Sequence, residues 1–210
     1  MAQFKTHMAG GALAAAGISM AALFTNLITL TQAGAIFIVG FIAGLLPDLD
    51  SDTGKPLTFL FQLVSILVPS IIFLEISEYV GDSPEFLICY FTISFLFFSY
   101  IVCSIVKKIT VHRGIMHSLP FAALCGAIIY LLFSSSGKQV AIIAALTTFS
   151  CCLVHLILDE FNSIKFKFGF IPSLKQSSGT ALKLKSNSML STIFTYTILT
   201  IVIAGSIVFF

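Results

Sequence analysis

The chain of 210 residues is a succession of apolar segments, each close to the length that a helix needs to cross a bilayer. About 20 apolar residues span the ~30 Å hydrocarbon core as a helix. Charged residues make up only 10% of the sequence, and the mean hydropathy is +1.06, so one water-soluble core could not bury the apolar side chains. The sequence therefore predicts an integral membrane protein. The apolar segments are residues 8–24, 27–46, 57–76, 85–106, 115–133, 140–158 and 189–210.

These segments predict an all-α fold, a polytopic transmembrane helical bundle of about seven spans that forms a single integral membrane domain over residues 1–210. Helix breakers support the divisions, with Pro47 after the second segment and Ser134 to Gly137 after the fifth. Gln32 and Gly34 interrupt the second segment, so a re-entrant or half-buried helix is an alternative there.

The basic residues predict the orientation. With the N-terminus in the cytoplasm and the loops alternating sides, all of the 11 lysines and arginines except Lys138 fall on the cytoplasmic side. We therefore expect a cytoplasmic N-terminus, an outside C-terminus and a bacterial-type inner (plasma) membrane. The net charge of +2 is too small to suggest a nucleic-acid partner, and membrane lipids are the expected partners.

The longest connection, residues 159–188, is expected to be a basic cytoplasmic loop at the membrane interface. Charged and aromatic residues alternate with a period of two from Lys165 to Phe170. A tether attracted to anionic lipids, at about 1 kcal/mol per lysine, and a substrate-binding segment are both consistent with this pattern.

All four histidines belong to polar clusters at the predicted inner ends of spans. Since successive spans alternate direction, such clusters can converge on one site at the cytoplasmic face, whereas the outer loops contain no histidine. The clusters are Thr6–His7, Pro47–Asp52, His112–Ser118 and His155–Glu160.

Two of these clusters have the spacing of metal ligands. His155 and Asp159 lie four residues apart, so on a helix both side chains leave from one face. Asp48, Asp50 and Asp52 are crowded carboxylates that repel one another unless a cation or hydrogen bonds offset the charge, although a solvated capping loop is the structural alternative. Carboxylates together with imidazoles suit Zn²⁺ or Mn²⁺ and suit Ca²⁺ poorly.

The other two clusters also admit structural roles. His7 precedes a stripe of small residues suited to close helix packing, so it is expected to face the bundle interior as a hydrogen-bonded core histidine or as a ligand. Ser118 is placed to cap the helix that Pro120 enters at its first turn, which leaves His117 at the mouth of the bundle. Arg113 suits either a phosphate or a positive-inside anchor. The stripe is Gly10, Ala14, Gly17 and Ala21.

Taken in order, Thr6-His7, Gly44-Leu45-Leu46-Pro47-Asp48-Leu49-Asp50, His112-Arg113-Gly114-x-x-His117-Ser118 and His155-x-x-x-Asp159 resemble the YdjM family, described as membrane-bound metal-dependent hydrolases. The resemblance runs from residue 6 to about 185. It also implies a distant similarity to zinc-dependent phospholipase C and P1 nuclease. The metal site that it implies consists of His7, Asp48, Asp50, His112, His117, His155 and Asp159.

The expected activity is hydrolysis of a phosphoester or phospholipid at the cytoplasmic leaflet, with one or two divalent ions, Zn²⁺ favoured over Mn²⁺, to activate water. Asp50 or Asp52 would act as general base, and Arg113 would steady a phosphate. The competing class is a non-enzymatic metal-handling or transport module, or a structural metal site. Transporters place polar residues near the bilayer midplane, where this chain has little beyond Ser, Thr, Gln62 and Glu75, so an interfacial site is favoured.

Overall fold

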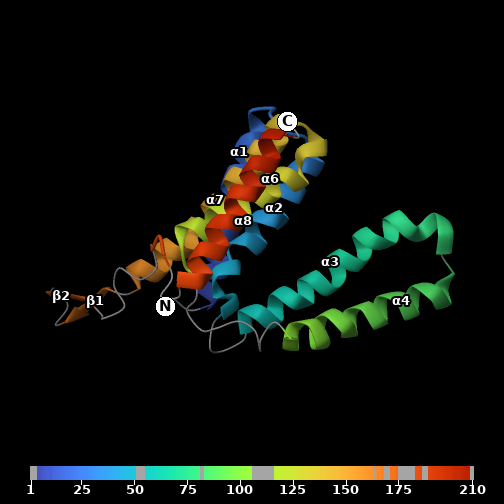
Figure 1. Cartoon of the computed structure of the whole chain (residues 1–210), viewed down its shortest axis with the longest axis horizontal. Coiled ribbons are helices and arrows are strands. Elements are labelled where there is room, and N and C mark those ends of the chain that lie inside the picture. The colour runs from blue at the N-terminus through green and yellow to red at the C-terminus, as the bar shows by residue number, and fades with distance from the viewer. Residues whose placement is uncertain are drawn as a thin grey trace. The chain divides into compact units, whose positions relative to one another are not determined.

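The computed structural model of the chain describes residues 4–50, 55–80, 83–105, 116–162, 164–167, 171–174, 183–185 and 189–208. The chain forms two compact units, one made of Met1–Asp48 with Arg113–Phe210 and the other of Leu49–His112. Helices dominate both units, which confirms the predicted helical class (Figure 1).

The first unit is a helical bundle with α7 (Lys138–Phe161) at its centre. Helix α7 packs against α1 (Phe4–Phe24), α2 (Leu30–Ala43) and α6 (Leu119–Leu132), and α8 (Met189–Val208) packs against α6 (Figure 1). Two short 3-10 helices lie in the connections. They are η1 (Leu46–Asp50), which follows α2, and η3 (Ser134–Ser136), which precedes α7.

Small residues let the helices of this unit approach closely. A Cβ added at Gly40 of α2 would lie 2.7 Å from Thr147 Cγ2 of α7 and 3.0 Å from Ala15 Cβ of α1. One added at Gly126 of α6 would lie 3.1 Å from the carbonyl oxygen of Ala145. Such contacts bring backbones together in membrane helix bundles, where lipid tails are as apolar as the side chains.

The buried face of α1 differs in register from the stripe that the sequence suggested. Gly10 packs against α7, where an added Cβ would lie 2.6 Å from Leu158 Cδ1, but Gly17 and Ala21 are exposed. Helix α1 lies against both α2 and α7, so its contacts follow rows of residues that are mostly four apart. The buried residues are His7, Gly11, Ala15, Ser19 and Ala22.

The second unit is a pair of helices that follow one another in the chain and pack side by side. Helix α3 (Lys55–Val80) packs against α4 (Pro84–Leu96), which continues into a π-helical turn, η2 (Phe97–Val102). Two hydrogen bonds connect α3 to the α4–η2 segment. Tyr90 donates a hydrogen bond of 2.9 Å to the Pro69 carbonyl, and Ser99 donates one of 3.1 Å to Ser65 Oγ.

In the part of the chain that the structure describes, five helices are long and apolar enough to cross a membrane by length and composition. Two shorter apolar helices, Thr58–Ser70 and Leu119–Leu132, lie in the other two predicted segments. Each predicted apolar segment thus contains a helix, whereas the count of seven spans and the sides of the termini stay predictions. The five are Phe4–Phe24, Leu30–Asp48, Pro84–Ile105, Lys138–Phe161 and Met189–Ser206.

The connection 159–188 contains two short paired strands that the sequence reasoning missed. Strand β1 (Ile164–Lys167) pairs antiparallel with β2 (Ile171–Leu174), in register Ile164 to Leu174. Further along, Lys183 forms a parallel bridge with Ser118, and its carbonyl accepts a 3.1 Å hydrogen bond from the Leu119 N–H. The end of the connection therefore lies beside the start of α6.

Candidate metal centre

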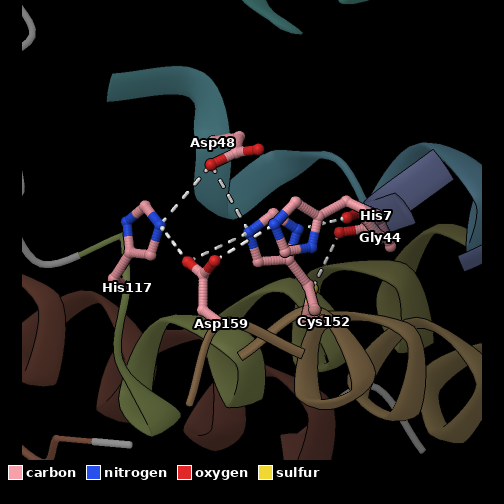
Figure 2. Close-up of polar contacts among 8 residues, drawn as sticks. His7, Gly44, Asp48, His117, Cys152 and Asp159 are labelled. Carbon is pink, nitrogen blue, oxygen red and sulfur yellow. Dashed lines mark hydrogen bonds and ion pairs between the residues drawn. The ribbon is translucent and has the colours of Figure 1, made fainter. Parts of the chain in front are cut away.

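One end of the bundle gathers five buried ionisable side chains. His7 comes from the start of α1, His155 and Asp159 come from the last turns of α7, Asp48 comes from η1, and His117 lies two residues before α6. Because α1 and α6 begin where α2 and α7 end, these side chains meet, and Figure 2 shows Asp48 and Asp159 directed toward the histidines. None of the five residues is more than 6% exposed.

Both carboxylates contact several imidazoles. His7 Nε2 lies 3.1 Å from Asp159 Oδ1, and the His7 ring stacks on that of His155 with centroids 3.7 Å apart. His117 Nε2 lies 3.7 Å from Asp48 Oδ1 and 3.5 Å from Asp159 Oδ2. His155 Nε2 lies 3.5 Å from Asp48 Oδ1 and 4.0 Å from Asp159 Oδ2.

The orientation of His155 decides what this cluster can bind. Its Nδ1 donates a 2.7 Å hydrogen bond to the carbonyl of Gly44, which can only accept. In the neutral ring Nε2 then carries a lone pair, and this buried nitrogen has no hydrogen-bond partner among the described residues. Its nearest carboxylate oxygen belongs to Asp48, so with a neutral ring two electron-rich atoms face each other at 3.5 Å in a buried site. A proton on Nε2 would remove the conflict, and so would a metal cation between the two atoms.

The spacing and chemistry of the donors fit a divalent metal ion. Ligands about 2.1 Å from a tetrahedral ion are roughly 3.4 Å from one another. One donor atom from each of His7, Asp48, His155 and Asp159 lies within 4.8 Å of all the others. Two imidazoles and two carboxylates are a ligand set that suits Zn²⁺ or Mn²⁺. These four residues could therefore hold a metal ion.

Comparison with known proteins agrees with the motifs. The family model described as YdjM inner membrane protein matches residues 1–210, the whole chain. The chain belongs to the YdjM family. No curated protein and no solved structure matches it significantly. Membership confirms the resemblance carried by the polar clusters, and the inner-membrane description of the family agrees with the apolar helices.

The structure of this YdjM protein brings together five of the residues that the sequence proposed, namely His7, Asp48, His117, His155 and Asp159. Asp50 ends η1, but its side chain is outside the described part of the chain. The remaining candidates, Asp52, His112 and Arg113, lie outside the described residues, and their roles stay predictions.

The predicted cap of α6 is confirmed, since Ser118 Oγ accepts a 3.4 Å hydrogen bond from the Phe121 N–H. Sequence reasoning missed two groups that support the centre of this YdjM protein, the Gly44 carbonyl and the thiol of Cys152, which donates to the Ala43 carbonyl. The position of Gly44 just before Pro47-Asp48 was the available signal, but a carbonyl has no signature in a sequence.

Proposed function

We propose that this chain is a membrane-bound metal-dependent hydrolase that acts on a phosphoester or phospholipid at the cytoplasmic face. The observation that carries the proposal is the buried Nε2 of His155, which the Gly44 hydrogen bond turns toward the carboxylate of Asp48 at 3.5 Å. An unpartnered buried acceptor costs about 1–3 kcal/mol, and a bound cation offsets that cost.

The chain supplies the ligands and the polar groups around them. His7, Asp48, His155 and Asp159 would hold one ion, with Zn²⁺ favoured and Mn²⁺ the alternative. His117 Nε2 lies 3.7 Å from the carboxylate of Asp48 and 3.5 Å from that of Asp159, and the three side chains together could bind a second ion. When bound, such an ion supplies Lewis acidity toward water and toward a phosphate oxygen.

Residues next to these ligands complete the proposed chemistry. Asp50 or Asp52 would take the proton of the attacking water, and Arg113 would hold a phosphate oxygen by paired hydrogen bonds. All three are close in sequence to Asp48 or His117, which supports their placement near the centre.

Lysines near the cluster support both the cytoplasmic location and an anionic substrate. Exposed Lys5 is two residues before His7, and Lys183 is bridged to Ser118, the neighbour of His117. Basic residues are enriched on the cytoplasmic side of membrane helices. They also attract anionic headgroups, at about 1 kcal/mol per residue near the surface.

A structural metal site is the second candidate, and the burial of the ligands favours it. Structural zinc sites have four protein ligands and no open position, whereas catalytic sites keep one position for water or substrate. His7, Asp48, His155 and Asp159 form a complete set of four, all buried. In that case the metal would hold α1, η1 and α7 together and would turn over no substrate.

Metal analysis followed by turnover separates these functions. Wild type, Asp48→Asn and Asp159→Asn would be purified in detergent and analysed for bound divalent metal, with exposed Glu85→Gln in the other unit as the control. We expect near-stoichiometric metal in wild type and control, and strong loss in both aspartate variants. Wild type without bound metal contradicts the hydrolase proposal outright.

The metal-loaded protein would then be assayed on p-nitrophenyl phosphoesters and on anionic phospholipid vesicles, before and after chelation. Turnover that chelation abolishes and Zn²⁺ restores supports the hydrolase. Metal that raises the unfolding temperature while no phosphoester is cleaved supports the structural site instead.

A further inference from the structure

The C-terminal end of α2 is capped by side chains of α7. The last carbonyls of a helix have no partner within it and must find donors elsewhere. The Ala43 carbonyl accepts from Cys152 Sγ at 3.1 Å, and the Gly44 carbonyl accepts from His155 Nδ1 at 2.7 Å. The two donors are three residues apart on α7, so one face of α7 holds the end of α2.

Gly44 also marks a close approach of α1 to the end of α2. A Cβ added at Gly44 would lie 3.0 Å from the Cα of Gly11, and one added at Gly11 would lie 3.4 Å from the Cα of Gly44. The backbone of Gly44 is helical, with φ −63° and ψ −13°, so any residue could adopt it. The need for glycine at this position is therefore a need for space.

This close approach sets the place of His7. His7 is one turn before Gly11 on the same buried face of α1, and its ring stacks on His155 with an angle of 13° between the planes. A contact of 3.0 Å is tighter than ordinary carbon contacts of about 3.5–4.0 Å, so a methyl group at residue 44 would force the α1 backbone at Gly11 to give by a few tenths of an ångström. Ligands of a functional site tolerate only about 0.5 Å of displacement.

We propose that Gly44 is a positioning residue of the metal centre. Its carbonyl holds His155 with Nε2 toward the carboxylates, and its missing side chain allows His7 to reach the same point. This role rests on the proposed function, because it presumes that the cluster holds a cation. Hydrogen bonds that orient ligating histidines in this way are typically worth 10- to 100-fold in metal affinity.

The chain offers matched controls. A Cβ at Gly17 of α1 or at Gly34 of α2 would meet no described atom within 4 Å outside its own helix backbone and chain neighbours. Gly17→Ala and Gly34→Ala add the same methyl group to α1 and α2, but that group makes no contact between the two helices.

The test uses the full chain in detergent. The dissociation constants of Zn²⁺ and Co²⁺ would be measured by chelator competition, and the visible spectrum would be recorded at saturating Co²⁺. Gly44→Ala keeps the carbonyl but shifts the backbone that carries it, so we expect dissociation constants about 10- to 100-fold above wild type and a changed shape of the Co²⁺ bands. Gly17→Ala and Gly34→Ala should stay within about twofold of wild type. Mere loss of folded protein would lower the band intensity at constant shape.

A second measurement does not depend on metal. Nitrogen-15 NMR of the ring nitrogens in metal-free wild type should assign the Nδ1–H tautomer to His155, and an Nε2–H tautomer would overturn the proposal. If Gly44→Ala does not fold, Gly11→Ala makes the milder contact of 3.4 Å from the other helix and should shift the metal affinity in the same direction.

The outcomes separate the two proposals. Normal cation binding in wild type, with Gly44→Ala equal to Gly34→Ala in affinity and spectrum, contradicts the positioning role alone. Wild type that has the Nδ1–H tautomer but takes up no cation contradicts the proposed function, and the positioning role with it.

Discussion

Replacing Gly40 by alanine tests the packing that brings the ligand-bearing helices together. Gly40 of α2 lies where this helix meets both α1 and α7. A Cβ there would lie 2.7 Å from Thr147 Cγ2, 3.0 Å from Ala15 Cβ and 3.3 Å from Cys151 Sγ. Ordinary contact is about 3.5–4.0 Å, so the neighbouring helices would have to give by roughly 1 Å.

The size of the effect follows from a comparison within α2. Alanine is about 1 kcal/mol better than glycine in a helix interior, and this gain applies equally at Gly34 and Gly40. Overpacking costs about 1–3 kcal/mol, and it applies only at Gly40, because a Cβ at Gly34 would contact none of the described neighbours. The Gly40→Ala variant should therefore be about 1–3 kcal/mol less stable than Gly34→Ala.

Thermal unfolding of the two metal-free variants in the same detergent measures this difference. At about 2–4 °C per kcal/mol for a chain of this length, Gly40→Ala should unfold about 2–12 °C below Gly34→Ala. An equal or higher unfolding temperature for Gly40→Ala would refute the close contact of α2 with α1 and α7. Helical content measured before heating confirms that both variants start folded.

Two further predictions concern the start of α6 and the topology. Ser118→Ala removes the acceptor for the Phe121 N–H and should destabilise the protein by about 0.5–2 kcal/mol, which thermal unfolding measures. The control Ser136→Ala changes an exposed serine outside any cap and should leave the unfolding temperature unchanged. Equal unfolding temperatures for the two variants would exclude a capping role for Ser118. A reporter fused after Phe210 should be active outside the cytoplasm while one fused before Met1 is active inside, and two reporters on the same side would contradict an odd number of spans.

Much of the architecture followed from the sequence because hydropathy is a local property. Long apolar segments predict helices in lipid wherever they occur, and each of the predicted segments contains one. The gathering of His7, Asp48, His117, His155 and Asp159 was foreseeable for a related reason. Helices that alternate direction bring the start of one segment beside the end of the next, so clusters at such ends meet.

The face that each helix turns inward was not foreseeable. In a soluble protein a buried face is marked by apolar residues at helical spacing, but a helix in lipid is apolar all round. The stripe proposed on α1 was therefore out of register, since Gly17 is exposed while Gly11 lies against Gly44. The antiparallel strands Ile164–Lys167 and Ile171–Leu174 were missed because the alternation of charged and aromatic residues there also fits an interfacial loop.

The sequence by itself determined that the helices are suited to lipid, where they lie along the chain and at which end of the bundle the ionisable residues gather. Tertiary structure alone decided that the Gly44 carbonyl meets His155 and that the rings of His7 and His155 stack. The physical reason is that both contacts depend on the rotation of each helix about its axis and on its depth beside its neighbours. Close packing between helices sets this rotation and depth, and neither can be predicted from the hydropathy of the sequence.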